Sequence, residues 1–252
     1  MNSNVPVITI DGLAASGKGS VACEVATRLG WNLLDSGLFY RVVAFLVDRY
    51  GLSLHDVSPI VGMINQTTQF VYSNAGVSVA TSTSNSKVQT QNTFILDDSH
   101  RVGYVRWNGN DITKEVRSDH ISKIAARVAA SEQIRKVLRP KQRERRQPPG
   151  LVADGRDMGT VIFPDAPLKI FLEASLAVRV SRRIRQLGLT ETKTEFQRIE
   201  KTMQERDNRD TLRKVAPAVA AVDAISLDSS DQTLAETVEV VINLAKERKI
   251  VP

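Results

Sequence analysis

A glycine-rich segment near the amino terminus has the composition of a loop that binds phosphate. It follows an apolar run at 7–10 and leads into a helical pattern. Its residues are Gly12, Leu13, Ala14, Ala15, Ser16, Gly17, Lys18, Gly19 and Ser20. Glycines let successive backbone N–H groups turn toward one anion, and the N-terminus of the next helix adds partial positive charge. We therefore predict a site for the phosphates of a nucleotide, with Lys18 reaching the β- and γ-phosphates.

The loop departs from the strict phosphate-loop pattern at one position. That pattern, G-x-x-x-x-G-K-[ST], places a magnesium-binding hydroxyl directly after the lysine, where this chain has Gly19. Ser20 comes one position later, so direct contact with magnesium is not expected of it. GTPases, ATPases and many kinases share such loops, and an ordinary strand-to-helix turn with an exposed lysine is the structural alternative. Residues elsewhere in the chain must distinguish among these alternatives.

Polar residues follow two further apolar runs, at 33–34 and 151–153. They are Ser36, Tyr40 and Arg41 after the first run, and Asp154, Arg156 and Asp157 after the second. Ligands of doubly wound sheets bind at the carboxyl ends of the strands, so these residues are candidates for binding. Ser36 is also a reasonable helix N-cap, and Tyr40 a reasonable core residue. A structural role is therefore as well supported for these two as a functional one.

Short apolar runs alternate with stretches of helical spacing along most of the chain. Strands are expected at 7–10, 33–34, 151–153, 169–172 and 224–227, and helices at 18–29, 37–50, 119–146, 176–187, 195–206 and 233–247. This order predicts an α/β fold in which a five-stranded parallel sheet has helices on both faces. The stretch at 204–214, dense in Arg and Asp, is interpreted as a mobile surface segment.

The polar region at 70–93 breaks this alternation. It shows strand-like alternation around Val77, Val79 and Val88. Further on, Tyr104–Trp107 precedes Asn108-Gly109, a pair typical of hairpin turns. We therefore predict a small antiparallel β insert over 66–112.

Composition bounds the class of protein. The 252 residues include 42% hydrophobic and 25% charged residues, as in an ordinary globular chain. The net charge of +6 suits small phosphorylated ligands as well as nucleic acid, but only two Trp and no interleaving of aromatic and basic residues argue against a nucleic-acid binder. No apolar window approaches the roughly 20 residues that span a bilayer. The single cysteine, Cys23, excludes an internal disulfide, and we expect a cytoplasmic protein.

Several motifs in this order resemble the bacterial cytidylate kinase family over nearly the whole chain. They are the loop ending Gly17-Lys18-Gly19-Ser20, then Leu34–Gly37 with Tyr40-Arg41, then 153–160 (ADGRDMGT), and finally Arg206-Asp207 with Asp210 and Arg213. The resemblance implies a fold of the P-loop NTPase type with a monophosphate-binding insert and a short Arg-rich lid. Its segments would be core at 1–65, insert at 66–112, core at 113–187, lid at 188–213 and core at 214–252.

The resemblance also implies an activity in pyrimidine nucleotide metabolism. The γ-phosphate of ATP would pass in line to cytidine monophosphate (CMP), and also to deoxycytidine monophosphate (dCMP), with Mg²⁺ bound mainly by ATP phosphates and water. Ser20 and Asp35 are further candidates near the metal, Asp35 through water or by organising the loop. The expected substrates are ATP and CMP or dCMP, with no nucleic-acid or membrane partner, and a monomer is expected. Lid closure would exclude water.

Site residues carry over from the family motif by motif. The acceptor phosphate would be held by Arg41, Arg156 and Arg213, the cytosine edge by Arg135 and Asp157, and sugar or phosphate by Ser36, Arg206 and Asp210, with Tyr40 beside them. Transition-state charge falls to Lys18, Arg156, Arg206 and Arg213, and no general base is expected. Ala126 stands where some members have a base-contacting serine, so Ser122 or water would supply that hydrogen bond.

Rival interpretations remain open at this point. A kinase of another nucleoside monophosphate, such as uridine monophosphate (UMP), would share most of these motifs. Small-metabolite kinases of the shikimate or gluconate type usually lack so large an insert. A guanine nucleotide switch would need an Asn-Lys-x-Asp segment, which this chain does not contain.

Overall fold

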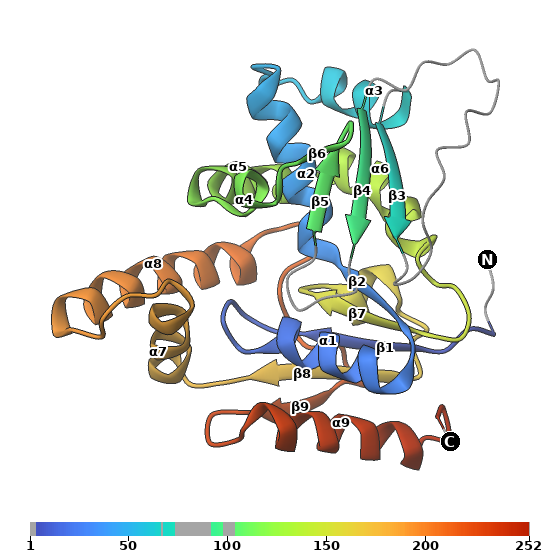
Figure 1. Cartoon of the computed structure of the whole chain (residues 1–252), viewed down its shortest axis with the longest axis vertical. Coiled ribbons are helices and arrows are strands. Elements are labelled where there is room, and N and C mark those ends of the chain that lie inside the picture. The colour runs from blue at the N-terminus through green and yellow to red at the C-terminus, as the bar shows by residue number, and fades with distance from the viewer. Residues whose placement is uncertain (1–3, 67, 74–91, 98–103, 252) are drawn as a thin grey trace. The chain divides into compact units, whose positions relative to one another are not determined.

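The computed structural model describes residues 4–66, 68–73, 92–97 and 104–251 (Figure 1). The chain forms two compact units. The first unit comprises Met1–Asn32 and Arg146–Pro252, and the second comprises Leu33–Arg145. The second is thus inserted in the sequence of the first. The five-segment division expected from the family stays a prediction.

A five-stranded sheet is built from four strands of the first unit and from β2 (Asn32–Asp35), which begins at the last residue before the second unit. Its order is β2, β7 (Leu151–Gly155), β1 (Val7–Asp11), β8 (Leu168–Glu173) and β9 (Ile225–Asp228). β1 pairs in parallel with β7 and β8, and β8 pairs in parallel with β9. The apolar residues of β1 and β7 are fully buried, as expected for strands covered on both sides. The prediction of a five-stranded parallel sheet is confirmed.

Four α-helices and one π-helical turn complete the described part of the first unit. They are α1 (Lys18–Leu29), η1 (Met158–Ile162), α7 (Leu176–Gln186), α8 (Lys193–Leu212) and α9 (Leu234–Glu247). The bounds of α1 agree with the prediction because Gly17 and Gly30, with φ of 98° and 64°, lie directly before and after it. α9 begins with a capping box between Thr233 and Glu236. α1 and α9 pack against each other (Figure 1).

α8 is longer than the sequence predicted. We expected a helix at 195–206 followed by a surface segment at 204–214, but one continuous helix covers 20 residues. Ile199 and Met203, one turn apart, pack with Val180 and Ile184 of α7. Asp207, a further turn along, is also buried. The inward face therefore continues through the polar stretch, and the helix continues with it.

The second unit combines helices with a small sheet. Its elements are α2 (Ser36–Arg49), α3 (Ser58–Gln66), β3 (Thr68–Ser73), β4 (Asn92–Asp97), β5 (Tyr104–Trp107), β6 (Asn110–Asp111), α4 (Thr113–Arg117), α5 (Asp119–Ala130) and α6 (Glu132–Arg143). β4, β5 and β6 are antiparallel, and the hairpin at Asn108-Gly109 is present as predicted. β3 pairs in parallel with β4, so the sheet is mixed. The strands expected around Val77, Val79 and Val88 lie outside the described residues.

Side-chain caps explain two helix boundaries that the sequence analysis placed differently. The single helix expected at 119–146 is interrupted at Ser131, whose hydroxyl accepts the N–H of Ile134 and starts α6. The N-cap of α2 is Asp35, which accepts the N–H of Leu38 at 3.2 Å. Ser36 is therefore not the cap of that helix but its first residue. α3 and α4 were not predicted.

Within the ranges the structure describes, none of the helices combines the length and apolar character that crossing a membrane requires.

Gly150 lies where a side chain would clash with an aromatic ring. A Cβ added there would come within 2.2 Å of the Trp31 ring. We expect Gly150→Ala to lower the free energy of unfolding by about 1–3 kcal/mol, because overpacking forces the ring or the backbone to move. The control is Gly62→Ala in α3, where a Cβ meets nothing within 4 Å and helix propensity improves by up to ~1 kcal/mol. Urea unfolding of both variants checks this, and equal stability of the two would contradict it.

Candidate active site

The segment between β1 and α1 has the geometry of a phosphate-binding loop. Gly12 has φ of 154°, and a Cβ there would lie 2.3 Å from the carbonyl oxygen of Leu172, so only glycine fits. Ala15 adopts a left-handed φ of 58°, which is strained for a residue with a side chain. The Ser16 hydroxyl is buried and, among the described residues, has no hydrogen-bond partner. A curled backbone, a free hydroxyl and a helix N-terminus together suit an anion.

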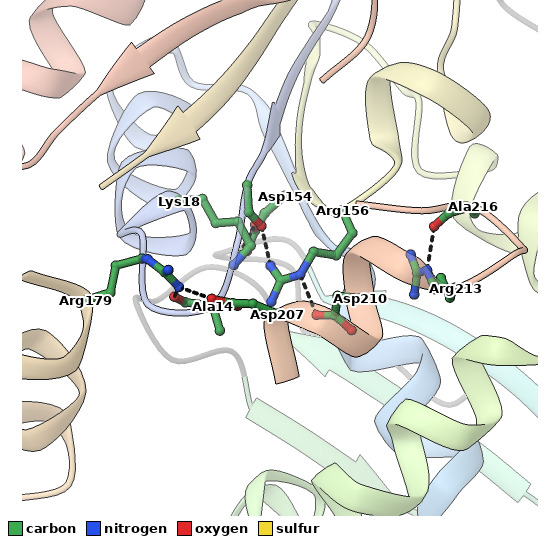
Figure 2. Close-up of polar contacts among 10 residues, drawn as sticks. Ala14, Lys18, Asp154, Arg156, Arg179, Asp207, Asp210, Arg213 and Ala216 are labelled. Atoms are coloured by element: carbon green, nitrogen blue, oxygen red, sulfur yellow. Dashed lines mark hydrogen bonds and ion pairs between the residues drawn. The ribbon is translucent and has the colours of Figure 1, made fainter. Parts of the chain in front are cut away.

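Lys18 is the first residue of α1, and Asp154 at the end of β7 lies beside it. Lys18 Nζ and Asp154 Oδ1 are 3.9 Å apart (Figure 2). A Cβ on Gly19 would lie 3.1 Å from Asp154 Oδ2, so the carboxylate contacts the start of the helix. Ser20 is exposed on the same helix. Sequence reasoning made Asp154 a candidate for binding but did not pair it with Lys18.

Asp11 at the end of β1 holds the turn that carries Asp157. Its carboxylate is buried and accepts the backbone N–H groups of Met158 at 2.9 Å and Gly159 at 2.8 Å. Burial raises the pKa of Asp11 to about 7, although the two N–H groups oppose this, and the negative charges of Asp157 and Asp154 add to it. Asp157, also buried, directly precedes η1. Asp11 therefore fixes the backbone from which Asp157 projects.

Arg156 connects the phosphate loop with α8. One guanidinium nitrogen donates to the carbonyl oxygen of Gly12 at 2.6 Å, and Nε donates to Asp210 Oδ2 at 3.0 Å (Figure 2). Burial acts to raise the pKa of Asp210, but the positive charges of Arg156, Arg206 and Arg213 outweigh it and keep that pKa below its usual value. Three guanidinium groups thus act on one carboxylate. The surplus of positive charge suits phosphate oxygens.

Arg213 follows the last residue of α8. Its Nε donates to the carbonyl oxygen of Ala216, four positions beyond the end of the helix (Figure 2). Five of the predicted site residues belong to the first unit: Lys18, Arg156, Arg206, Asp210 and Arg213.

Two arginines on α7 contribute contacts that the sequence analysis missed. Arg179 is buried and donates to Asp207 at 2.6 Å and to the carbonyl oxygen of Ala14 at 3.2 Å (Figure 2). Arg182 donates to the carbonyl oxygen of Ser16 at 2.8 Å and contacts Ser229. The phosphate loop is thereby tied to α7 and, through Asp207, to α8. The only sequence signal was the i, i+3 spacing of the two arginines, which is common on solvated helices.

The second unit gathers another set of predicted residues between α2 and α6. Ser36 and Tyr40 lie one turn apart on α2, and both are buried. The guanidinium of Arg135, on α6, lies over the Tyr40 ring at 5.2 Å from its centroid. The Ser36 hydroxyl donates to Gln142 Oε1, also on α6, at 2.7 Å. Gln142 was not singled out from the sequence.

Asp35 is the N-cap of α2, and Arg41 lies in the second turn of that helix. Arg41 donates to the carbonyl oxygen of Val116 at 3.0 Å and to the Ser122 hydroxyl at 2.8 Å. Ser122 in turn donates to the carbonyl oxygen of Ser118 at 2.7 Å, so its proton is already engaged. Asp35 caps α2 and lies 3.8 Å from Arg117. Ala126 is partly buried on α5, one turn after Ser122.

Comparison with known proteins adds the family. The family model described as cytidylate kinase matches residues 8–247. The chain belongs to the cytidylate kinase family. A cytidylate kinase from Bordetella bronchiseptica is 42% identical over 238 residues, 94% of each chain, and one from Klebsiella pneumoniae is 37% identical over 249 residues, 98% of each chain. Among solved structures, a gluconokinase from Sinorhizobium meliloti aligns with a TM-score of 0.34 and 18% identity, covering 97% of this chain and 94% of that one.

Asp11 should make stability depend on pH. Its folded pKa of about 7 exceeds the ordinary 3.8, so the folded state binds an extra proton between these values. The stabilisation from that proton is fully present below pH 3.8 and is lost as the pH rises through about 7. We expect the free energy of unfolding of the native protein to fall, relative to Asp11→Asn, over this range. Urea unfolding from pH 5 to 8, at steps of roughly one unit, measures this; a constant difference would contradict it.

Proposed function

We propose that this chain catalyses direct transfer of the γ-phosphate of ATP to CMP, and to dCMP. The observation that carries the proposal is the position of Arg156. One guanidinium contacts both the phosphate loop, at Gly12, and the carboxylate of Asp210, which Arg206 and Arg213 also influence. An arginine that touches the donor loop and belongs to a cationic cluster suits the phosphoryl group in transfer.

The mechanism relies on alignment and charge rather than on a base. Phosphoryl transfer passes through a loose transition state with negative charge on the equatorial oxygens. Lys18 would bind the β- and γ-phosphates at the helix N-terminus, and Arg156, Arg206 and Arg213 would stabilise the charge that develops. Phosphate oxygens would compete with the Gly12 carbonyl and with Asp210 for the guanidinium of Arg156. Arg179 and Arg182 would hold the loop backbone, through Ala14 and Ser16, while this exchange occurs.

Magnesium would accompany ATP, and Asp154 suits it better than the residues expected from sequence. The ion neutralises the β- and γ-phosphate charges when bound. Asp154 lies beside Lys18 at the start of α1, where a carboxylate can accept from magnesium-bound water. Asp35 already caps α2 and faces Arg117, and Ser20 is exposed. We therefore assign Asp154, rather than Asp35 or Ser20, to the water shell of the ion.

The acceptor nucleotide would be held by the residues expected from the family. Arg41, with Arg156 and Arg213, would hold its phosphate, and Tyr40 would support Arg135, whose guanidinium lies over the Tyr40 ring. Arg135 and Asp157 would read the cytosine edge, since a carboxylate accepts from the exocyclic amine that uracil lacks. Ser122 is engaged with Arg41 and Ser118, so we assign it to placing Arg41 and not to the base. We further propose a cytoplasmic monomer with no nucleic-acid partner.

The function is tested by ADP formation from ATP and Mg²⁺ with each acceptor in turn. CMP, dCMP, UMP, AMP and GMP are supplied separately, beside a control without acceptor. We expect ADP to form chiefly with CMP and dCMP. Equal rates with UMP would contradict the cytosine assignment, and ADP that forms without any acceptor would contradict phosphoryl transfer itself.

Arg156→Ala should lower turnover with every acceptor. Removing one preorganised donor from developing charge costs about 10²–10³ in kcat, and the loss should not depend on the base. Arg198→Ala is the matched control, because its side chain is 56% exposed and forms an ion pair with Glu195, three residues earlier on α8. Steady-state kinetics of both variants with CMP and dCMP check this. A variant that loses activity with one acceptor alone would contradict a role in transfer.

A further inference from the structure

The hydrogen bond between Ser36 and Gln142 fixes the direction of a hydroxyl. Ser36 is 3% exposed and Gln142 is fully buried, and Ser36 Oγ donates to Gln142 Oε1 at 2.7 Å. A serine hydroxyl has one proton and two lone pairs. With the proton engaged by a carbonyl oxygen, Ser36 Oγ can only accept any further hydrogen bond.

The other end of Gln142 argues against a purely structural role. Its Nε2 atom is buried and, within the part of the chain that the structure describes, meets no hydrogen-bond acceptor. A buried donor without a partner destabilises a fold, whereas Leu or Met of similar volume would not. The interior of the second unit thus holds a side chain that is unfavourable for packing and whose hydrogen bond, among the described residues, goes to Ser36.

The hydrogen bond between Ser36 and Gln142 lies between α2 and α6, the same two helices that bring together Tyr40 and Arg135, the residue proposed to bind the base. On α2, Ser36 and Tyr40 are separated by four residues, and on α6, Arg135 and Gln142 are separated by seven. Both spacings return to one face of a helix. Arg135 lies over the Tyr40 ring, and Gln142 binds Ser36. Ser36 therefore lies on the same α2 face as Tyr40, whose ring Arg135, the residue assigned to cytosine, covers.

We infer that Gln142 is a positioning residue that makes Ser36 an obligate hydrogen-bond acceptor and so selects an N–H or O–H donor on the acceptor nucleotide. The inference rests on the proposed function and deepens it. Phosphate oxygens carry no proton to donate, so Ser36 does not bind them. The family resemblance implied that Ser36 contacts either the sugar or the phosphate, and of these two the contact with the sugar remains. The donor is either the exocyclic amine of cytosine or a sugar hydroxyl. A carbonyl at the same place, such as O4 of uracil, is rejected.

Two substitutions of Gln142 test this through ratios of kcat/KM. Gln142→Met removes the acceptor and frees the Ser36 proton, so the selectivity should fall by roughly tenfold, the value of one hydrogen bond. A fall in the CMP/UMP ratio identifies the cytosine amine as the donor, and a fall in the CMP/dCMP ratio identifies the 2′-hydroxyl. Gln142→Glu keeps an oxygen acceptor for the Ser36 hydroxyl, because a carboxyl group accepts through its carbonyl oxygen whether it is neutral or ionised, so both ratios should stay close to the native values.

The controls separate this inference from a general loss of structure. In Ser36→Ala, adding Gln142→Met should change neither ratio further, because the residue on which Gln142 acts is gone. Unchanged ratios in Gln142→Met alone would overturn the inference, as would an equal loss with all three nucleotides. If Gln142→Met does not fold, ratios that fall by roughly tenfold in Gln142→Glu overturn it, because that variant keeps the acceptor. Native protein that does not phosphorylate CMP would contradict the proposed function, whereas native activity with unchanged variant ratios contradicts the inference alone.

Discussion

The shared guanidinium of Arg156 is the contact on which the first unit's site depends. It binds the carbonyl of Gly12 on one side and the carboxylate of Asp210 on the other. Gly12 is confined by the carbonyl of Leu172, so the loop end of this contact cannot shift freely. The α8 end is held separately, because Arg179 binds both Asp207 and the carbonyl of Ala14. Phosphate loop and α8 are therefore joined through two arginines, and the position of one constrains the other.

Two carboxylates, on Asp210 and Asp11, have different roles in this arrangement because their neighbours differ. Asp210 faces guanidinium groups, which lower its pKa despite burial, so it stays charged and offsets their repulsion. Burial raises the pKa of Asp11 to about 7, helped by the charges of Asp157 and Asp154 and opposed by the two backbone N–H groups that it accepts. Asp11 is thus poorly suited to binding a cation. It is well suited to holding the backbone of Met158 and Gly159, which directly follow Asp157. The same residue type serves as charge balance in one place and as a backbone clamp in the other.

The sequence predicted helix boundaries best where the residue at the helix end itself determines the end. α1 begins and ends as predicted because Gly17 and Gly30 supply the left-handed conformations themselves. It was least informative where a distant partner decides. α8 continues past the predicted end because its inward face packs on α7, and Asp154 gains a role only because β7 places it next to Lys18. The Asp35 cap was missed because a serine beside an aspartate offers two equally good caps.

The direction of the hydrogen bonds in the second unit determines which side chains can donate to a ligand and which can only accept, and residue types alone do not show this. Ser36 and Ser122 both donate their protons inward, to Gln142 and to the carbonyl oxygen of Ser118. Neither hydroxyl retains a donor for a ligand. Guanidinium groups supply donors there, and Arg41 is already oriented by Ser122. Anionic oxygens would therefore be recognised by arginine, and amine or hydroxyl protons by serine and aspartate. A nucleotide carries both kinds of group, so it would satisfy both sets of residues.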